Sequence, residues 1–482
     1  MKRLLVVCLL ILCMVPSFVY AEASENSLYP IRENGLWGYM NRQGEVVIEP
    51  QWDHVELFEQ GYATVSINSG DHEEMTFIID QEGRSILDPA WEYLSGDVFI
   101  DPETDLCGFF DRKSGFLQEP VYEPLWPRDG IDTEFLIVAR YSGTYEDAEL
   151  YTYESLLRYG AVRKSDGKII VPLEYTGGDY DDVGSSEGYI LMANEIHGRT
   201  SDSDWGPEYH LFDGNGNEII FPEGIEPCGT PHDGVLTIRQ KLNNEIKKQL
   251  STEDDYVYGL AKPDGTIITE PCYDAIFDAS NGMVGFLQDH NSGFMGWLNL
   301  AGEVIVPPVC RTYLEGLYPE EQYFNDYLAF WDAETQCYVL VDRNGCKLYS
   351  APYPRGSIVY KFNSVMSNHC FWQIVIAKGT ARYQLMKIEN SQVTPVTEPI
   401  YEEVGYSCSP DSVICNDETL LADEPIPVCM NGKCGFIDAN GSIVIPLKYD
   451  AVMHFYGDLA MVEKDGKLAH IDHDGNTVWE EK

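Results

Sequence analysis

A short pattern of glycine, proline and aromatic residues recurs along nearly the whole chain of 482 residues. Three copies align by eye, one starting at Gly35, one at Tyr258 and one at Lys433. A period of this kind marks a stack of small similar units, so it constrains the fold more than any single motif does. We therefore expect a repeat array rather than one large core.

Each copy holds the same parts in the same order. A Gly followed by an aromatic or apolar residue opens it, as in Gly38-Tyr39, and an Asp or Asn follows in most copies. Next comes a turn Gly, found at Gly44, Gly83, Gly115, Gly167, Gly216, Gly265, Gly302, Gly345, Gly441 and Gly475. A Pro and then an aromatic residue complete most copies, as in Pro50-Trp52, Pro89-Trp91, Pro120-Tyr122, Pro172-Tyr175, Pro271-Tyr273 and Pro446-Tyr449.

Each part of the copy has a structural interpretation. The turn Gly supplies the positive φ of a tight hairpin, and the Asp or Asn before it hydrogen-bonds the turn backbone. The flanking segments are β-branched, so both are predicted strands. We predict that the Pro ends the second strand, because it cannot donate to a ladder, and that the aromatic starts a third. A second Gly, as in Gly61-Tyr62, opens a fourth strand.

Four short antiparallel strands in about 40 residues make one small sheet, which needs stacked neighbours to bury its faces. The predicted fold is therefore all-β, with propeller-like blades, and an open β-solenoid is the alternative. About ten copies and a partial one exceed the usual blade number of a propeller. One large ring, two smaller propellers and an open stack all remain compatible with the pattern.

These residues resemble the WG repeat family, named for the step written here as Trp37-Gly38. The resemblance covers roughly residues 30–482, although only the first copy has a literal Trp-Gly. It implies a bacterial, exported interaction scaffold without a catalytic motif. It transfers no functional residue to this chain.

The N-terminus is typical of a signal peptide. Lys2 and Arg3 precede an apolar stretch that ends before Pro16, and Ala21 closes a plausible cleavage site. The expected organisation is a signal peptide at 1–21, a short linker at 22–29 and the repeat array at 30–482. A retained anchor is the alternative. We expect a secreted protein, extracellular or associated with the cell envelope, with no membrane span after cleavage.

Charge and cysteine content narrow the partners. The net charge is −47, which repels phosphate backbones and argues against nucleic-acid binding. Thirteen cysteines are present, and removing Cys8 and Cys13 with the signal peptide leaves an odd number. Export permits disulfides, but the sequence assigns no pairing and no oligomeric state.

The connection before each new Gly-aromatic step varies most in length. It is long at 141–157, 195–208 and 240–256, and the last segment spaces Ile238, Leu242, Ile246 and Leu250 as in a short helix. Equivalent connections of a repeat array crowd onto one face, which is often the binding face. The candidate ligand-facing residues are Asp71, His72, Glu73, Tyr145, Glu146, Asp147, Asp202, Asp204, Trp205, Lys247 and Lys248.

Catalytic and metal motifs have structural explanations. Gly184–Gly188 matches G-x-S-x-G, but a strand is expected after it where a nucleophile elbow needs a helix. Asp472–Asn476 resembles a calcium loop but coincides with a repeat turn. Acidic clusters such as Asp179–Asp182 leave weak calcium binding as the one cofactor hypothesis. The recurring aromatics are assigned to packing, and Trp126 and Trp205 to the surface.

The sequence therefore predicts a non-catalytic extracellular scaffold that binds a protein or glycan partner at the cell surface. The alternative is a glycan-acting hydrolase with an acidic site on the repeat face. No cofactor is expected for the first of these functions.

Overall fold

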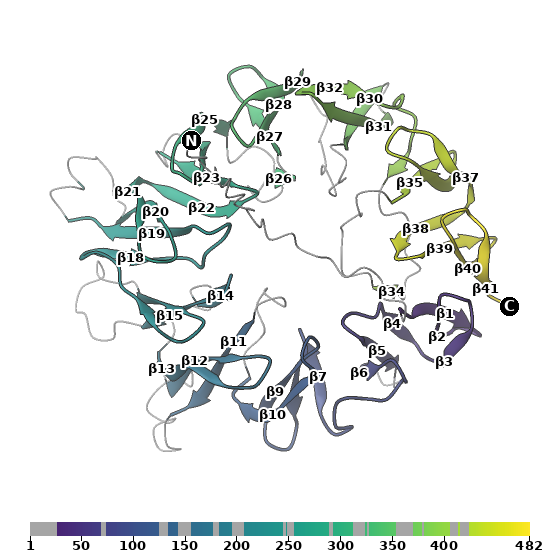
Figure 1. Ribbon diagram of the computed structural model, residues 1–482, viewed down its shortest axis with the longest axis horizontal. Helices are drawn as coiled ribbons and strands as arrows, with labels where there is room; N and C mark the ends of the chain where they lie inside the picture. Colours follow the sequence, from purple (N-terminus) through teal and green to yellow (C-terminus); the bar gives the residue numbers. More distant parts are fainter. Residues whose placement is uncertain are drawn as a thin grey trace, which may run out of the picture.

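The small sheets of this protein form a closed ring (Figure 1). The computed structural model describes residues 27–68, 74–124, 134–142, 156–176, 183–194, 207–243, 247, 255–288, 293–311, 323–324, 327–352, 370–377, 380–404, 413–414 and 424–482. The described residues form ten sheets, one of which joins two four-stranded units, giving eleven blades. The first and last blades are neighbours in the ring. The predicted all-β, propeller-like fold is confirmed, and the chain does not form an open solenoid.

Blades 1 to 6 occupy the first half of the chain. Blade 1 contains β1 (Tyr29–Glu33), β2 (Leu36–Met40) and β3 (Val46–Trp52); blade 2 contains β4 (His54–Glu56), β5 (Tyr62–Asn68) and β6 (Glu74–Asp80); blade 3 contains β7 (Glu92–Ser95), β8 (Val98–Asp101), β9 (Leu106–Asp111) and β10 (Phe116–Tyr122). Blade 4 contains β11 (Phe135–Tyr141), β12 (Leu157–Arg163) and β13 (Ile169–Tyr175); blade 5 contains β14 (Gly184–Ser186), β15 (Tyr189–Asn194), β16 (Glu208–Asp213) and β17 (Glu218–Ile219); blade 6 contains β18 (Ile225–Pro227), β19 (Leu236–Lys241), β20 (Tyr256–Ala261) and β21 (Ile267–Tyr273).

Blades 7 to 11 complete the ring. Blade 7 contains β22 (Ala275–Ser280), β23 (Met283–Leu287), β24 (Phe294–Asn299) and β25 (Val304–Arg311); blade 8 contains β26 (Tyr323–Phe324), β27 (Tyr327–Asp332), β28 (Cys337–Asp342) and β29 (Lys347–Pro352); blade 9 contains β30 (Cys370–Ala377), β31 (Thr380–Glu389) and β32 (Gln392–Pro395). Blade 10 contains β33 (Glu403–Val404), β35 (Ile426–Met430), β36 (Lys433–Ile437) and β37 (Ile443–Tyr449); blade 11 contains β38 (Ala451–Tyr456), β39 (Leu459–Lys464), β40 (Lys467–Ile471) and β41 (Thr477–Glu480). The short strand β34 (Val413–Ile414) pairs in parallel with β4.

A blade is offset from the sequence repeat. The Gly-aromatic strand and the strand after the turn Gly are the third and fourth strands of one blade, whereas the next two strands of the copy open the following blade. The first strands β4, β14, β22 and β38 lie toward the ring centre in Figure 1. Each copy therefore ties two neighbouring blades together covalently. The first strand of the ring, β1, begins at Tyr29.

The prediction that Pro ends a strand is wrong. Pro50 lies inside β3, and Trp52 is the last residue of that strand instead of the first residue of the next. The pairing of β2 with β3 shifts register between Trp37 and Tyr39, which places a bulge at the proline. β3 is the outermost strand of its blade, so its far edge needs no donor from Pro50. Pro120, Pro172, Pro271, Pro307 and Pro446 lie inside strands in the same way.

The same bulge explains the Gly of the Gly-aromatic step. A Cβ atom added to Gly38 would lie 2.6 Å from the Pro50 nitrogen and 2.8 Å from the Glu49 carbonyl carbon. Carbon atoms in contact stay about 3.5–4.0 Å apart, so only glycine lets the bulged strand come this close. Gly38 is therefore required because the neighbouring strand lies too close for a side chain, and not because of its own backbone angles.

The turn residues confirm their predicted roles. All ten turn glycines have positive φ, for example 82° at Gly44. The Asn41 side chain accepts hydrogen bonds from the amides of Gln43 and Glu45, both at 3.0 Å. Asp80, Asp213, Asn299, Asp342, Asp438 and Asp472 accept bonds within their own turns in the same manner. These turns are thus set by local chemistry.

The turn glycines also make the seams between blades. A Cβ atom on Gly83 of blade 2 would lie 3.2 Å from the Ile48 side chain of blade 1, and one on Gly265 of blade 6 would lie 2.9 Å from the Ile220 carbonyl oxygen after blade 5. At the junction of the chain ends, the corresponding atom on Gly44 would lie 2.6 Å from the Val478 carbonyl oxygen of blade 11. The closing seam therefore repeats the contact made at internal seams.

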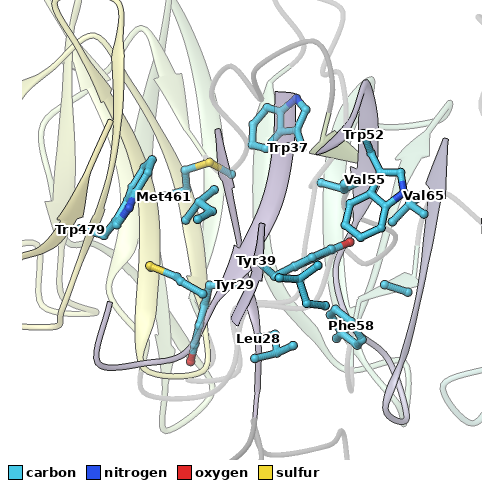
Figure 2. Close-up of a cluster of buried hydrophobic side chains, with 14 of the residues drawn as sticks. Leu28, Tyr29, Trp37, Tyr39, Trp52, Val55, Phe58, Val65, Met461 and Trp479 are labelled. Atoms are coloured by element: carbon cyan, nitrogen blue, oxygen red, sulfur yellow. The ribbon is translucent and has the colours of Figure 1, made fainter. Parts of the chain in front are cut away.

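Buried side chains fill the space between neighbouring blades. One cluster joins both ends of the chain, because Met461 and Trp479 of blade 11 pack with Tyr29 and Trp37 of blade 1 (Figure 2). The assignment of the recurring aromatics to packing is confirmed, since Trp52, Tyr122, Tyr273 and Tyr449 are buried. Trp91 is half-buried and stacks on Phe99 with ring centroids 4.8 Å apart.

One disulfide is present among the described residues. Cys429 and Cys434 are directly opposite each other on β35 and β36, and their sulfur atoms are bonded. The sequence assigned no pairing, since the partners are fixed by strand register. No helix in the described ranges is long and apolar enough to cross a membrane.

Candidate functional site

The three long connections arise at one position in three consecutive blades. They lead into the third strand position of blades 4, 5 and 6, which β12, β16 and β20 occupy; blade 4 has no described first strand, so β11 takes its second position. The connections run from Tyr141 to Leu157, from Asn194 to Glu208 and from Lys241 to Tyr256. Strands alternate in direction within a blade, so second-to-third connections lie on one side of the ring, which we call the loop face. The equivalent connections of blades 10 and 11 are tight turns, such as Asp465-Gly466.

Most of the predicted ligand-facing residues lie outside the described residues. These are Asp71, His72, Glu73, Tyr145, Glu146, Asp147, Asp202, Asp204, Trp205 and Lys248, together with Trp126 and the Asp179–Asp182 cluster. Lys247 is described and forms an ion pair with Asp255. Its amide donates to the Asn243 carbonyl oxygen at 3.0 Å, as in a helical turn. The predicted helix did not begin at Ile238, which lies in β19, because pairing with β18 and β20 holds that residue in the sheet.

An arginine sandwich lies at the base of the connections of blades 5 and 6. The Arg239 guanidinium is 4.5 Å from the ring centre of Tyr209 and 4.2 Å from that of Tyr256. Its Nη2 donates to Glu226 Oε2 at 3.0 Å and to the Pro207 carbonyl oxygen at 2.6 Å. Arg239 is only 8% exposed, so this cation is held by fully formed partners and not by solvent. The ends of β16 and β20, where the connections attach, are thereby fixed.

A second polar network lies beside it in blade 5. His210 Nδ1 is 2.7 Å from Glu218 Oε1, and His210 Nε2 is 3.3 Å from Asn194 Nδ2. Asn194 Oδ1 accepts the Thr176 amide at 3.2 Å, which orients the Asn194 amide group as a donor toward the imidazole. His210 Nδ1 therefore carries the proton and Nε2 accepts, so both nitrogens are engaged.

This network occupies both imidazole nitrogens of His210 with protein partners. The Tyr175 ring lies 5.4 Å from His210, and burial raises the pKa of its phenol, with Glu218 and Glu174 adding to the effect. The carboxylates at the base of the connections, Glu218 and Glu226, are bound to His210 and Arg239 respectively. No group of His, Cys, Asp and Glu side chains suited to holding a metal occurs in the described part of the chain.

The two catalytic-looking motifs are parts of the repeat. Gly184–Ser186 forms β14, the chain turns at Glu187 and Gly188, and β15 follows. The absence of a helix at this turn, as predicted, excludes a nucleophile elbow there. Ser185 donates to the Phe135 carbonyl oxygen at 3.1 Å. In the Asp472–Asn476 segment, Asp472 accepts the amides of Asp474 and Asn476, so the segment is a turn, as predicted.

Sequence reasoning missed the residues beneath the connections. Arg239, Tyr209, Tyr256, Asn194, His210 and Glu218 were not among the candidates, although each lies on a strand of blade 5 or 6. One available signal was their position, since Asn194 and Tyr256 are the strand residues that border the long connections. The pairing of Arg239 with two tyrosines from neighbouring blades has no such local signal.

Comparison with known proteins identifies the repeat. The "WG containing repeat" family matches at residues 37–70, 258–289 and 435–467, in blades 1 to 2, 6 to 7 and 10 to 11. No curated protein matches the chain by sequence.

Solved structures that resemble the fold are distant in sequence. One described as a eukaryotic initiation factor is 11% identical, with a TM-score of 0.36, and the match covers 94% of this chain and 95% of that one. BamB from Moraxella catarrhalis is 11% identical, with a TM-score of 0.22 and 94% coverage of both chains. The β-propeller domain of the Trilobed protease from Pyrococcus furiosus is 8% identical, with a TM-score of 0.27, 73% coverage of this chain and 99% of that one.

Proposed function

We propose that this ring, which contains WG-containing repeats at three positions, is a non-catalytic scaffold that binds a protein or glycan partner on its loop face. The observation that carries the proposal is the placement of the long connections. They occur at one position of blades 4, 5 and 6, so the strand ends from which they depart belong to three consecutive blades. Scaffolds of this kind keep function in loops that the framework positions.

The base supports binding better than catalysis. Arg239 and His210 are both saturated with partners, so they anchor strand ends and offer no reactive atom. The net charge of −47 favours a basic protein surface or a neutral glycan over nucleic acid. The alternative hydrolase is not favoured by any carboxylate pair at the base of the connections, because Glu218 and Glu226 are occupied.

The location of the partner belongs to the same proposal. The N-terminal residues have the order of a signal peptide, with Lys2 and Arg3 before an apolar segment and Ala21 at the cleavage point. We place the partner outside the cytoplasm, in the cell envelope or the surroundings. Detection of the mature chain, starting at Glu22, in the exported fraction tests this part independently of binding.

Loop replacement tests the proposal directly. In one variant the connections of blades 4, 5 and 6 become two-residue Asp-Gly turns like Asp465-Gly466. In the control only the short turn at 102–105 of blade 3, which holds no candidate residue, becomes Asp-Gly. Both purified chains are used to capture proteins from the producing cell's envelope and to probe a glycan array. We expect the triple variant to lose a partner that the control retains. Equal capture by both would overturn the assignment.

A further inference from the structure

The chain ends meet without exchanging a strand. Blade 1 contributes β1 to β3 and blade 11 contributes β38 to β41, and no described strand of one end pairs into the sheet of the other. Blade 1 also has no described strand on the inner side of β1. Across the junction of the chain ends, β34 pairs in parallel with β4 of blade 2, whereas the contacts between blades 1 and 11 themselves are made through side chains, among them the Arg32–Glu481 ion pair at 3.0 Å.

A histidine of blade 11 satisfies the open edge of β1. Pro30 has no amide hydrogen, which suits an unpaired strand edge. Its carbonyl oxygen lies 2.7 Å from Nε2 of His470 in β40. A carbonyl oxygen only accepts, so Nε2 carries the proton and donates. His470 thus supplies a hydrogen bond that a neighbouring strand gives elsewhere in the ring.

The other nitrogen of His470 is buried without a partner. Nδ1 has no hydrogen-bond partner in the described residues, and the side chain is 2% exposed. The ring lies edge-on to Tyr29 and Trp479, at centroid distances of 6.0 and 6.2 Å. Burial lowers the pKa of His470 to about 4, although the Pro30 bond acts in the opposite direction. Protonation would place a second N–H and a positive charge in this site without an acceptor.

The tyrosines around His470 already have partners of their own. On β1, the Tyr29 hydroxyl accepts the Asp458 amide; on β38, Tyr456 donates to the Phe58 carbonyl oxygen, and His454 lines the same small cavity as His470.

The nearby carboxylates have other partners. Asp458 pairs with Arg42, and Glu481 pairs with Arg32. Burial acts to raise the pKa of Glu481, but the hydrogen bonds from Arg32 and the Leu468 amide outweigh it and leave that pKa below its ordinary value.

We infer that the seam between blades 1 and 11 is an acid-sensitive latch, in which protonation of His470 opens this seam while the seams between the other blades and the β34–β4 pair hold. An open seam exposes His470 to water and restores its ordinary protonation. The proton therefore favours the open form, and the latch loses strength as pH falls from about 6.5 toward 4. At pH 5 the ratio of open to closed seams rises about 20-fold over its value at neutral pH.

The net charge of the chain predicts the opposite pH dependence, so acid opening of the seam can be told apart from a general charge effect. The chain carries a net charge of −47 at neutral pH, and acid reduces this self-repulsion. The Arg32–Glu481 pair persists in mild acid because the pKa of Glu481 is lowered. Opening of the seam between blades 1 and 11 near pH 5, with the sheets intact, is therefore the effect expected from protonation of His470.

The test compares three forms of the mature chain between pH 7.5 and 4. His470→Gln keeps a donor for the Pro30 carbonyl oxygen but does not titrate. His473→Gln is the control, because it changes an exposed histidine in the hairpin turn after β40 that contacts Glu424. Small-angle scattering reports the maximum dimension, amide exchange of β1 and β40 reports the seam, and circular dichroism reports the sheets. We expect amide exchange of β1, corrected for its intrinsic pH dependence, to accelerate about 20-fold from pH 7 to pH 5 in wild type and His473→Gln, and to stay slow in His470→Gln.

Two outcomes overturn the latch: β1 exchange that accelerates in His470→Gln at the same pH as in wild type, or β1 exchange in wild type that does not accelerate by pH 4. If His470→Gln does not fold, the C2-hydrogen exchange of each histidine in the wild type measures its pKa directly. The latch requires His470 to titrate well below the ordinary value of a histidine, together with faster amide exchange of β1 below pH 5. Titration of His470 at the ordinary value, or unchanged β1 exchange, refutes it.

Discussion

Replacing Gly160 with alanine tests the role assigned to the step glycine. Gly160 lies in β12, where β13 bulges past it, and its φ is not in the left-handed region. A Cβ atom there would lie 2.6 Å from the Val171 carbonyl oxygen and 2.9 Å from the Leu173 amide nitrogen. The alanine therefore forces the outer strand away from its partner.

The cost follows from two effects. Overpacking of a well-filled site costs about 1–3 kcal/mol. The shift also weakens the ladder bonds beside the bulge, at roughly 1 kcal/mol each. We expect Gly160→Ala to lower the free energy of local opening of β13 by about 3 kcal/mol, which corresponds to roughly 150-fold faster amide exchange in that strand.

Gly188 provides the matched control. Its φ is +81° and no atom lies within 4 Å of an added Cβ, so Gly188→Ala carries only backbone strain of roughly 1–2 kcal/mol. Hydrogen–deuterium exchange of both variants, read at β13 and β15, separates steric conflict from strain. The reasoning is refuted if β13 in Gly160→Ala exchanges no faster than β15 in Gly188→Ala, since the bulge would then tolerate a side chain.

Two further substitutions test contacts between and within blades. Asp97 and Arg112 form a buried ion pair at 2.8 Å, so Asp97→Asn leaves a buried cation without its counter-charge and should lower the free energy of unfolding by about 3 kcal/mol. Glu103→Gln, at an exposed position, is the control in thermal unfolding, and equal melting temperatures of the two variants would contradict the assignment. Replacing Cys429 and Cys434 with serine, or reducing the wild type, should lower the free energy of unfolding by about 2 kcal/mol. Complete alkylation of both thiols without any fall in melting temperature would count against the disulfide.

Local chemistry made the turns predictable from the sequence. The glycine at Gly44 and the asparagine at Asn41 act through bonds within four residues, so their roles are readable in one copy of the repeat. The closed ring was among several arrangements that the repeat allowed. Choosing between them depends on the contact of Gly44 with Val478, which joins residues at opposite ends of the chain.

Features that depend on a neighbouring strand could not be predicted in the same way. Pro50 reads as a strand end because its missing donor is visible, whereas the bulge that accommodates it appears only when β2 and β3 are paired. The Arg239 sandwich likewise needs Tyr209 from one blade and Tyr256 from another. The position of the long connections was predictable, but the fixed residues beneath them were not.

The repeated seam bears on where the chain can begin and end. Gly44 meets Val478 as Gly265 meets Ile220, so the contact does not depend on whether the two blades are joined by a peptide link or separated by the termini. Blade 1 therefore follows blade 11 around the ring in the same way as blade 6 follows blade 5. Joining Lys482 to the start of blade 1 and opening the chain between Tyr273 and Asp274, after β21, would give a circular permutant that retains every blade contact. The present termini are one choice among several that the ring geometry allows.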